Sequence, residues 1–160
     1  MNSCWVTHSA EETHQLGRML GSSIKVGDLW LLHGQLGAGK TTLVQGIAWA
    51  VGFDGYAHSP TFVIVNEYRA DVTIFHIDLY RLDGGALEAS ELGIDEMLLE
   101  GACLVEWADK TPELFRQPEL VINIDFGGDE QTRVFNVESH GSRAEAVAEA
   151  VSAGWGRDRE

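Results

Sequence analysis

The sequence has few cysteines and no long hydrophobic run. Cys4 and Cys103 are the only two cysteines, which excludes a disulfide scaffold and a cysteine-based metal cluster. Both fall in apolar, strand-like stretches, so we expect them to be inert packing residues. No stretch of about 18 apolar residues occurs, which argues against a membrane-spanning helix. Residues 1–12 lack the basic and apolar regions of a secretory signal, so we expect a cytoplasmic protein.

Positive charge is also scarce. Eleven Lys and Arg residues stand against 25 Asp and Glu residues, which gives a formal net charge of -14. Affinity for nucleic acid depends largely on contacts from basic side chains to phosphates, so we expect no unaided binding of RNA or DNA. An acidic surface is compatible with docking on a basic protein partner, although it commonly serves solubility alone.

Helical and strand-like patterns alternate along the 160 residues. Helices are predicted from the capping box at Ser9, over residues 41–51, in short pieces over 84–99 with a break at Gly93, and after Ser142. Buried strands are predicted at residues 4–7, 28–33 and 102–106, and hairpins at residues 62–69 with 72–79 and 120–126 with 132–138. This order predicts one α/β domain over residues 1–153, with a mixed, mostly parallel sheet flanked by helices and extended by antiparallel hairpins. We expect residues 154–160 to form a frayed tail.

Residues 34–41, GQLGAGKT, match the pattern G-x-x-x-x-G-K-[S/T] between a predicted strand and a predicted helix. Glycines in such a loop let backbone N–H groups curve around an anion, and the helix N-terminus adds partial positive charge. The backbone positions expected to bind the nucleotide are Gly34, Gly37, Ala38 and Gly39. The loop therefore predicts a P-loop NTPase-like domain.

The residues after the glycines supply the side chains that this chemistry needs. Lys40 can reach the β- and γ-phosphates of a nucleotide, and the Thr41 hydroxyl suits a magnesium ion. Thr42 is a further nucleotide-binding candidate, although it can serve simply as the second residue of the helix.

Two predicted strands end in an acid on the side of the sheet where the loop lies. Asp78 ends VTIFHID and Glu106 ends ACLVE. Ligands of α/β sheets bind at the carboxyl ends of the strands, so both acids are candidates for the magnesium site. The spacing does not decide which one binds the metal and which holds a water. His76 shares a face with Asp78, a position more typical of a supporting residue than of a base.

The segment SPTF, residues 59–62, precedes the first predicted hairpin. Pro60 stiffens it. The loop before it, residues 53–58, contains a glycine and few apolar residues, which suits a mobile, switch-like segment whose hydroxyls sense a γ-phosphate. An ordinary loop that contains a serine and a threonine is an equally good interpretation.

Five motifs, GQLGAGKTT, SPTFVIVNEY, HIDLYRL, LGIDE and VEW, occur in this order. Together they resemble the bacterial TsaE (YjeE) family over residues 7–135. That family is a P-loop ATPase needed to make threonylcarbamoyladenosine in tRNA beside the anticodon, together with the proteins TsaB and TsaD. The resemblance implies that this chain binds and slowly hydrolyses Mg-ATP. It also implies that the chain meets tRNA only through the complex, in which TsaD carries the transferase chemistry.

The resemblance also implies roles for individual residues. Residues 37–42 would hold the phosphates, and Thr41 and Glu106 would bind Mg²⁺. Asp78 resembles the family's catalytic acid and would act together with Lys40. Three further positions match by resemblance: Thr61 as the switch-like residue, Trp107 as the aromatic that follows the acid, and Arg133 as a basic residue that contacts the base. Gln35 and Ala108 depart from the family's usual residues without removing a ligand.

Two other functions share the same loop. A nucleotide-gated assembly module would use ATP binding to build a complex, with hydrolysis incidental. A small-molecule kinase would need a lid with several arginines, and Arg116 is the only arginine between residues 84 and 118. The sequence has no N-K-x-D motif for reading guanine, which favours adenine.

Overall fold

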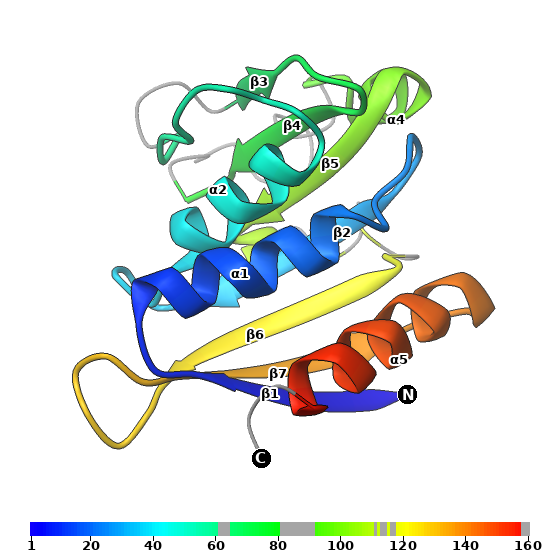
Figure 1. Ribbon diagram of the computed structural model, residues 1–160. Coiled ribbons are helices and arrows are strands. Elements are labelled where there is room, and N and C mark those ends of the chain that lie inside the picture. Colours follow the sequence, from blue (N-terminus) through cyan, green and yellow to red (C-terminus); the bar gives the residue numbers. More distant parts are fainter. Residues whose placement is uncertain (61–64, 81–91, 111, 113–114, 116–117, 158–160) are drawn as a thin grey trace.

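The computed structural model describes residues 1–160 except 61–64, 81–91, 111, 113–114, 116–117 and 158–160. A seven-stranded sheet forms its centre, in the order β1-β7-β6-β2-β5-β4-β3 (Figure 1). Its strands are β1 (Asn2–Thr7), β2 (Leu29–Gly34), β3 (Val65–Tyr68), β4 (Thr73–Asp78), β5 (Gly101–Glu106), β6 (Leu120–Phe126) and β7 (Arg133–Ser139). Strands β6, β2, β5 and β4 are parallel, whereas β7, β1 and β3 pair antiparallel at the two sides. The predicted mixed sheet is confirmed, and so are both predicted hairpins over the described residues; residues 62–64 of the first predicted hairpin lie outside them.

Three helices, α1 (Ala10–Gly21), α2 (Lys40–Ala50) and α5 (Ser142–Arg157), cover one face of the sheet (Figure 1). They bury the larger core, which includes Leu32, Leu104 and Phe135 from the strands. The residues that alternate with these, such as Cys103 and Val105, point to the opposite face. There they form a smaller core under α4 (Ile94–Glu100) and the short helix Ala108–Lys110. The helix α4 begins after Gly93, as predicted, and the predicted helical stretch before it lies mostly outside the described residues.

Glycines bring α1 and α2 into backbone contact. A Cβ atom on Gly46 of α2 would lie 2.2 Å from the carbonyl oxygen of His14, and one on Gly17 of α1 would lie 2.4 Å from that of Leu43. No side chain fits at these separations, so the two helices pack with their main chains touching. This close contact fixes α1 beside the helix that follows the glycine-rich residues 34–41, called here the phosphate loop after their predicted role.

The two ends of the chain meet on the same side of the sheet. The Trp5 indole of β1 donates to Ser152 of α5 at 2.9 Å, and the Trp155 indole donates to the carbonyl of Val6 at 3.0 Å. Trp155 is buried, so α5 continues to Arg157. The predicted frayed tail from residue 154 is therefore wrong for residues 154–157, because an apolar ring anchors that turn. Residues 158–160 lie outside the described part.

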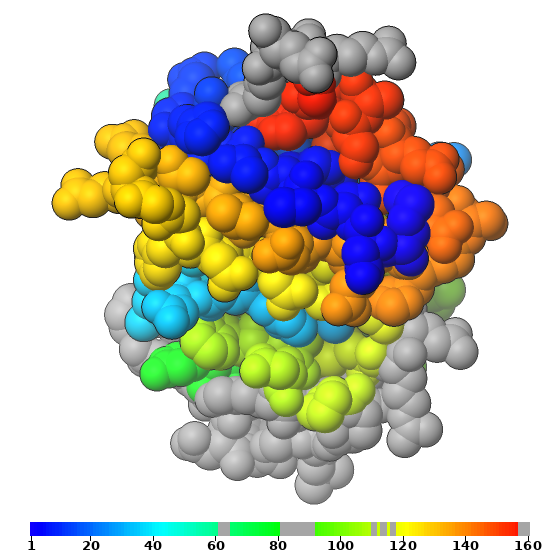
Figure 2. Space-filling model, turned by 90° about the horizontal axis from the view of Figure 1, so that it is seen from below, coloured from blue at the N-terminus to red at the C-terminus, as the bar shows by residue number. Residues whose placement is uncertain are grey.

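The two cysteines have different environments. Cys103 is completely buried in β5, as predicted, and this burial raises its thiol pKa to about 12. Cys4 is exposed, so the expectation that it packs inside the protein is wrong. It alternates with Trp5, which faces α5, and therefore points to the other side of β1. On that side β1, β7 and β6 reach the surface (Figure 2).

No helix among the described residues has both the length and the apolar character needed to cross a membrane.

Candidate phosphate-binding site

The glycine-rich loop joins the end of β2 to the start of α2. Gly37 and Gly39 have positive φ angles of 80° and 107°, which L-residues with a side chain rarely adopt. A Cβ on either would meet nothing within 4 Å, so open space lies above both residues. Ala38 between them is buried, and its N–H donates to the Gln35 carbonyl at 3.0 Å. The loop is thus a closed turn that faces an open space at a helix N-terminus, which suits an anion.

Lys40 is buried at the base of this turn, with 6% of its side chain exposed. Its ammonium donates to the Gly34 carbonyl and lies 3.9 Å from Glu106 Oε1 and 4.5 Å from the centre of the Trp107 ring. Burial lowers the pKa of Lys40, and the neighbouring acids Glu106, Asp78 and Asp109 oppose that shift. The lysine is therefore held in place by acceptors and an aromatic face.

The two candidate acids are adjacent in space. Asp78 and Glu106 are partners in the parallel pairing of β4 with β5, at the last residue of each strand. Both are buried. Burial raises the pKa of Asp78; the Tyr80 N–H, which donates to its Oδ1 at 2.8 Å, opposes that shift, and the charge of Glu106 adds to it. The strand ends thus place two carboxylates beside the lysine of the loop.

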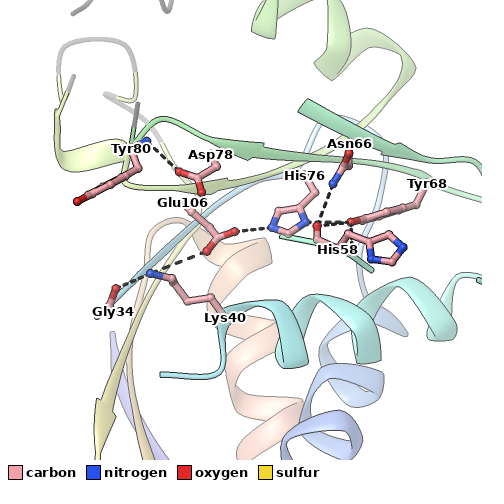
Figure 3. A network of polar contacts seen from close by, with 9 residues as sticks. All are labelled: Gly34, Lys40, His58, Asn66, Tyr68, His76, Asp78, Tyr80 and Glu106. Carbon is pink, nitrogen blue, oxygen red and sulfur yellow. Dashed lines mark hydrogen bonds and ion pairs between the residues drawn. The ribbon is translucent and has the colours of Figure 1, made fainter. Parts of the chain in front are cut away.

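A buried histidine connects Glu106 to the neighbouring hairpin (Figure 3). His76 Nε2 lies 2.6 Å from Glu106 Oε2, and its Nδ1 lies 3.1 Å from the Tyr68 hydroxyl. A carboxylate only accepts hydrogen bonds, so Nε2 carries the proton in this contact. His76 is completely buried, and both ring nitrogens are occupied. It supports the acid, as its position in the sequence indicated.

Trp107 follows Glu106 in a left-handed conformation, with a φ of 61°, the only positive φ of a residue other than glycine in the described part of the chain. Its ring lies under the Lys40 ammonium and 4.9 Å from the Tyr80 ring. Such a conformation costs about 1–3 kcal/mol and is typical of functional sites. The strained backbone turns the indole toward the phosphate loop.

A cavity of about 260 Å³ opens beside the loop, on the side of α1. It is lined by the helix start at Ser9, Ala10 and Thr13, by the loop at Gly37, Gly39 and Thr42, and by Glu130, Gln131 and Arg133. Arg133 donates from Nε to the Ala38 carbonyl at 3.1 Å and from Nη1 to the carbonyls of Glu130 and Thr132, and it lies over the Phe126 ring. Arg133 therefore braces the loop and also borders a space next to the phosphate site.

The site holds oxygen donors of the kind that a magnesium ion shared with a nucleotide would use. The described residues contain no group of three or more His, Cys, Asp or Glu side chains that could hold a metal alone. Mg²⁺ usually takes one or two protein oxygens and completes its shell with phosphate and water. The Thr41 hydroxyl on the first turn of α2 and the Glu106 carboxylate are oxygen donors of this kind.

The structure gathers most of the residues that the sequence singled out. Gly34, Gly37, Ala38, Gly39, Lys40, Thr41 and Thr42 form the loop and helix start; Asp78 and Glu106 lie beside Lys40; Arg133 contacts the loop from β7. Thr61 lies outside the described residues. Tyr68 was missed, although the hairpin pattern contained a signal. The register pairs Tyr68 with Ile74, which puts its side chain on the same face as His76, two residues further along β4.

Comparisons with known proteins agree with this geometry. The family model described as "Threonylcarbamoyl adenosine biosynthesis protein TsaE" matches residues 7–135. A relative from Bacillus subtilis (strain 168), named "tRNA threonylcarbamoyladenosine biosynthesis protein TsaE", is 38% identical over 150 residues, which cover 92% of each chain. A protein of the same name from Streptomyces coelicolor is 39% identical over 69% of this chain and 77% of its own length. The crystal structure of Bacillus subtilis YdiB matches with a TM-score of 0.79 and 33% identity over 96% of both chains. The chain therefore belongs to the TsaE family.

Proposed function

We propose that this protein acts in the biosynthesis of threonylcarbamoyladenosine in tRNA, as an ATPase subunit that works with TsaB and TsaD. The names of its relatives support the pathway. The main support for an ATPase activity is that Lys40, Glu106 and Asp78 lie close together at the base of the phosphate loop. The partners rest on the family resemblance, and the cytoplasmic location is a further part of the proposal.

The residues of the chain divide the work. The N–H groups from Gly37 to Thr42 orient the phosphates, and Lys40 supplies a fixed positive charge beside them. Thr41 and Glu106 hold Mg²⁺, which when bound neutralises charge on the phosphates. Asp78, close to Glu106 but in contact with a backbone N–H, orients the attacking water. The cavity between α1 and Arg133 receives the nucleoside.

The charge of the protein supports an indirect role on RNA. Of the 11 basic residues, Lys40 and Arg133 already contact the phosphate loop. A surface with a net charge of -14 repels the tRNA backbone, so the contact with tRNA belongs to the partner proteins.

The experiment is an ATPase assay of the purified protein with Mg²⁺, alone and with the two partner proteins, beside an assay of tRNA modification. We expect slow turnover alone and faster turnover in the complex. Asp78→Ala should retain ATP binding and lose hydrolysis by about 100-fold or more. Asp95→Ala, at an exposed aspartate of α4, is the matched control and should behave as wild type. Absence of turnover in the complete system contradicts the proposal.

The same variant separates hydrolysis from simple nucleotide gating. If Asp78→Ala binds ATP, fails to hydrolyse it and still supports tRNA modification, then binding alone is sufficient. In that case the nucleotide-gated assembly module replaces the ATPase.

A further inference from the structure

A series of hydrogen-bonded, mostly buried polar groups, called here the polar chain, extends from the phosphate site in the direction away from the loop (Figure 3). It runs from Glu106 through His76 and Tyr68 to the backbone of His58, and so reaches residues 53–60, called here the 53–60 segment. The links come from β5, β4 and β3 in turn.

The two oxygens of Glu106 serve different partners. Oε1 faces Lys40 at 3.9 Å, and Oε2 contacts His76 at 2.6 Å. Glu106 is 3% exposed and His76 is fully buried, so water does not compete for this contact. A rotation of the carboxylate would leave a buried imidazole N–H without an acceptor, which is unfavourable. His76 therefore restricts the orientation of the carboxylate proposed to bind the metal.

Tyr68 continues the chain on the other side of the ring. Its hydroxyl accepts from the His58 N–H at 3.1 Å, and its single proton can go either to His76 Nδ1 or to the His58 carbonyl, each 3.1 Å away. Asn66 donates to the same carbonyl at 2.9 Å. One hydroxyl thus contacts both polar groups of a single residue's backbone. The hydroxyl therefore contacts the main chain at residue 58 and does not depend on the His58 side chain.

The 53–60 segment has a second attachment, to the helix that starts with the phosphate loop. Gln45 of α2 donates to the Gly55 carbonyl at 3.2 Å and accepts from the Ala57 N–H at 2.6 Å. Trp49 of α2 also donates to the Gly55 carbonyl at 3.1 Å. The segment therefore spans two elements that both lead to the phosphate site, α2 and the hairpin of β3 and β4.

We infer that His76 is a positioning residue for Glu106, and that Tyr68 transmits the orientation of that carboxylate to the backbone of the 53–60 segment. This role rests on the proposed function, because Glu106 has a metal to hold only if the protein binds Mg-ATP. Occupation of the metal site then changes how firmly the segment is held, because the buried hydrogen bonds adjust together. A purely structural role for the same bonds would change stability alone.

The test uses three variants and two readouts that need no turnover. Tyr68→Phe removes one hydroxyl. His76→Gln keeps a donor near the Nε2 position, and His76→Leu removes both polar groups. The readouts are the half-saturating Mg²⁺ concentration for binding a fluorescent ATP analogue, and amide hydrogen exchange of peptides that cover residues 53–60, with and without Mg-ATP. Tyr56→Phe is the matched control: it also removes one tyrosine hydroxyl, and Tyr56 lies in the same segment but is 72% exposed.

We expect His76→Leu to raise the half-saturating Mg²⁺ concentration by about fivefold or more, with nucleotide affinity in EDTA unchanged, and His76→Gln to restore most of it. In the wild type, Mg-ATP should change exchange in the segment. Tyr68→Phe and His76→Gln should lose that change, because each breaks the contact between Tyr68 and His76. Tyr56→Phe should behave as wild type in both readouts.

Equal Mg²⁺ dependence in wild type and His76→Leu overturns the positioning role, and a nucleotide-dependent exchange change that persists in Tyr68→Phe overturns the transmission. If His76→Leu does not fold, as judged by thermal unfolding, His76→Gln and Tyr68→Phe still decide the transmission. The two proposals can be refuted separately. A wild-type protein that does not bind Mg-ATP refutes the proposed function. A wild-type protein that binds Mg-ATP, with variants that match it in both readouts, refutes only the coupling.

Discussion

Asp78 and Glu106 stand side by side at the ends of neighbouring parallel strands, paired residue to residue. Both are buried, and Lys40 lies 3.9 Å from one of them, so two carboxylates share one nearby ammonium. The charge of Glu106 adds to the rise in the pKa of Asp78, as expected for two like charges in a poorly solvated site. The site by itself therefore carries more negative than positive charge.

Asp78→Asn should stabilise the protein when metal and nucleotide are absent. Burial raises the pKa of Asp78 in the folded state above its ordinary value of 3.8. At pH values between 3.8 and this raised pKa, the unfolded state binds fewer protons than the folded state. Stability therefore falls as the pH rises through this window, and the neutral amide removes that loss. We expect Tm at pH 7 to rise by about 2–4 °C in EDTA.

The matched control for this pair is Asp95→Asn at an exposed position, which should leave Tm unchanged. Differential scanning calorimetry at pH 4 and pH 7 measures both variants. A lower Tm for Asp78→Asn at pH 7, or an advantage that is larger at pH 4 than at pH 7, contradicts the prediction.

Gly46→Ala should strongly destabilise the fold. The new methyl group would lie 2.2 Å from the His14 carbonyl, so α1 and α2 would have to separate, which we expect to cost about 3 kcal/mol. Gly156→Ala in α5 meets nothing within 4 Å and should change stability by less than about 1 kcal/mol. Urea denaturation compares the two variants, and similar midpoints would show that the helices tolerate separation.

Arg133→Met should weaken nucleotide binding by about tenfold, because it removes the brace on the Ala38 carbonyl and a wall of the adjacent cavity. The methionine retains an apolar stem against Phe126, so the fold should persist. Arg69→Met, at a side chain that is 85% exposed, is the control. Titration calorimetry with ATP measures both, and equal affinities for the two variants would remove Arg133 from the site.

Thiol labelling should distinguish the two cysteines. We expect a disulfide reagent to modify one thiol per chain in the native protein and two in denaturant, because Cys4 is exposed and Cys103 is buried with a pKa of about 12. Cys4→Ser should then show no native labelling. Two rapidly labelled thiols in the native protein would show that β5 opens readily.

The phosphate loop and the acids at the strand ends were predictable because each depends on a short stretch of chain. A glycine pattern between a strand and a helix specifies the loop, and an apolar run that stops at Asp78 or Glu106 specifies a strand end. Their pairing was not predictable, because it depends on the strand order, in which β5 lies between β2 and β4. Residues remote in sequence become neighbours only through that order.

The errors also have physical reasons. Cys4 belongs to an apolar stretch, but the helices of the described residues cover only one face of the sheet at β1, and hydrophobicity alone does not say to which face a residue points. The tail prediction failed because Trp155 finds an acceptor on β1, at the other end of the chain. Tyr68 escaped notice because its role lies in a single hydroxyl that contacts backbone atoms and a buried ring.

The pairing of β1 with β7 has a consequence for synthesis on the ribosome. Thr7 pairs with Arg133, and Ser9 borders the same cavity as Arg133. The phosphate loop emerges early, but the strand β6, which flanks it, begins at Leu120. A nascent chain therefore carries an incomplete pocket beside the phosphate loop until β6, β7 and Arg133 have left the exit tunnel, so the walls of this pocket form long after the loop itself has been made.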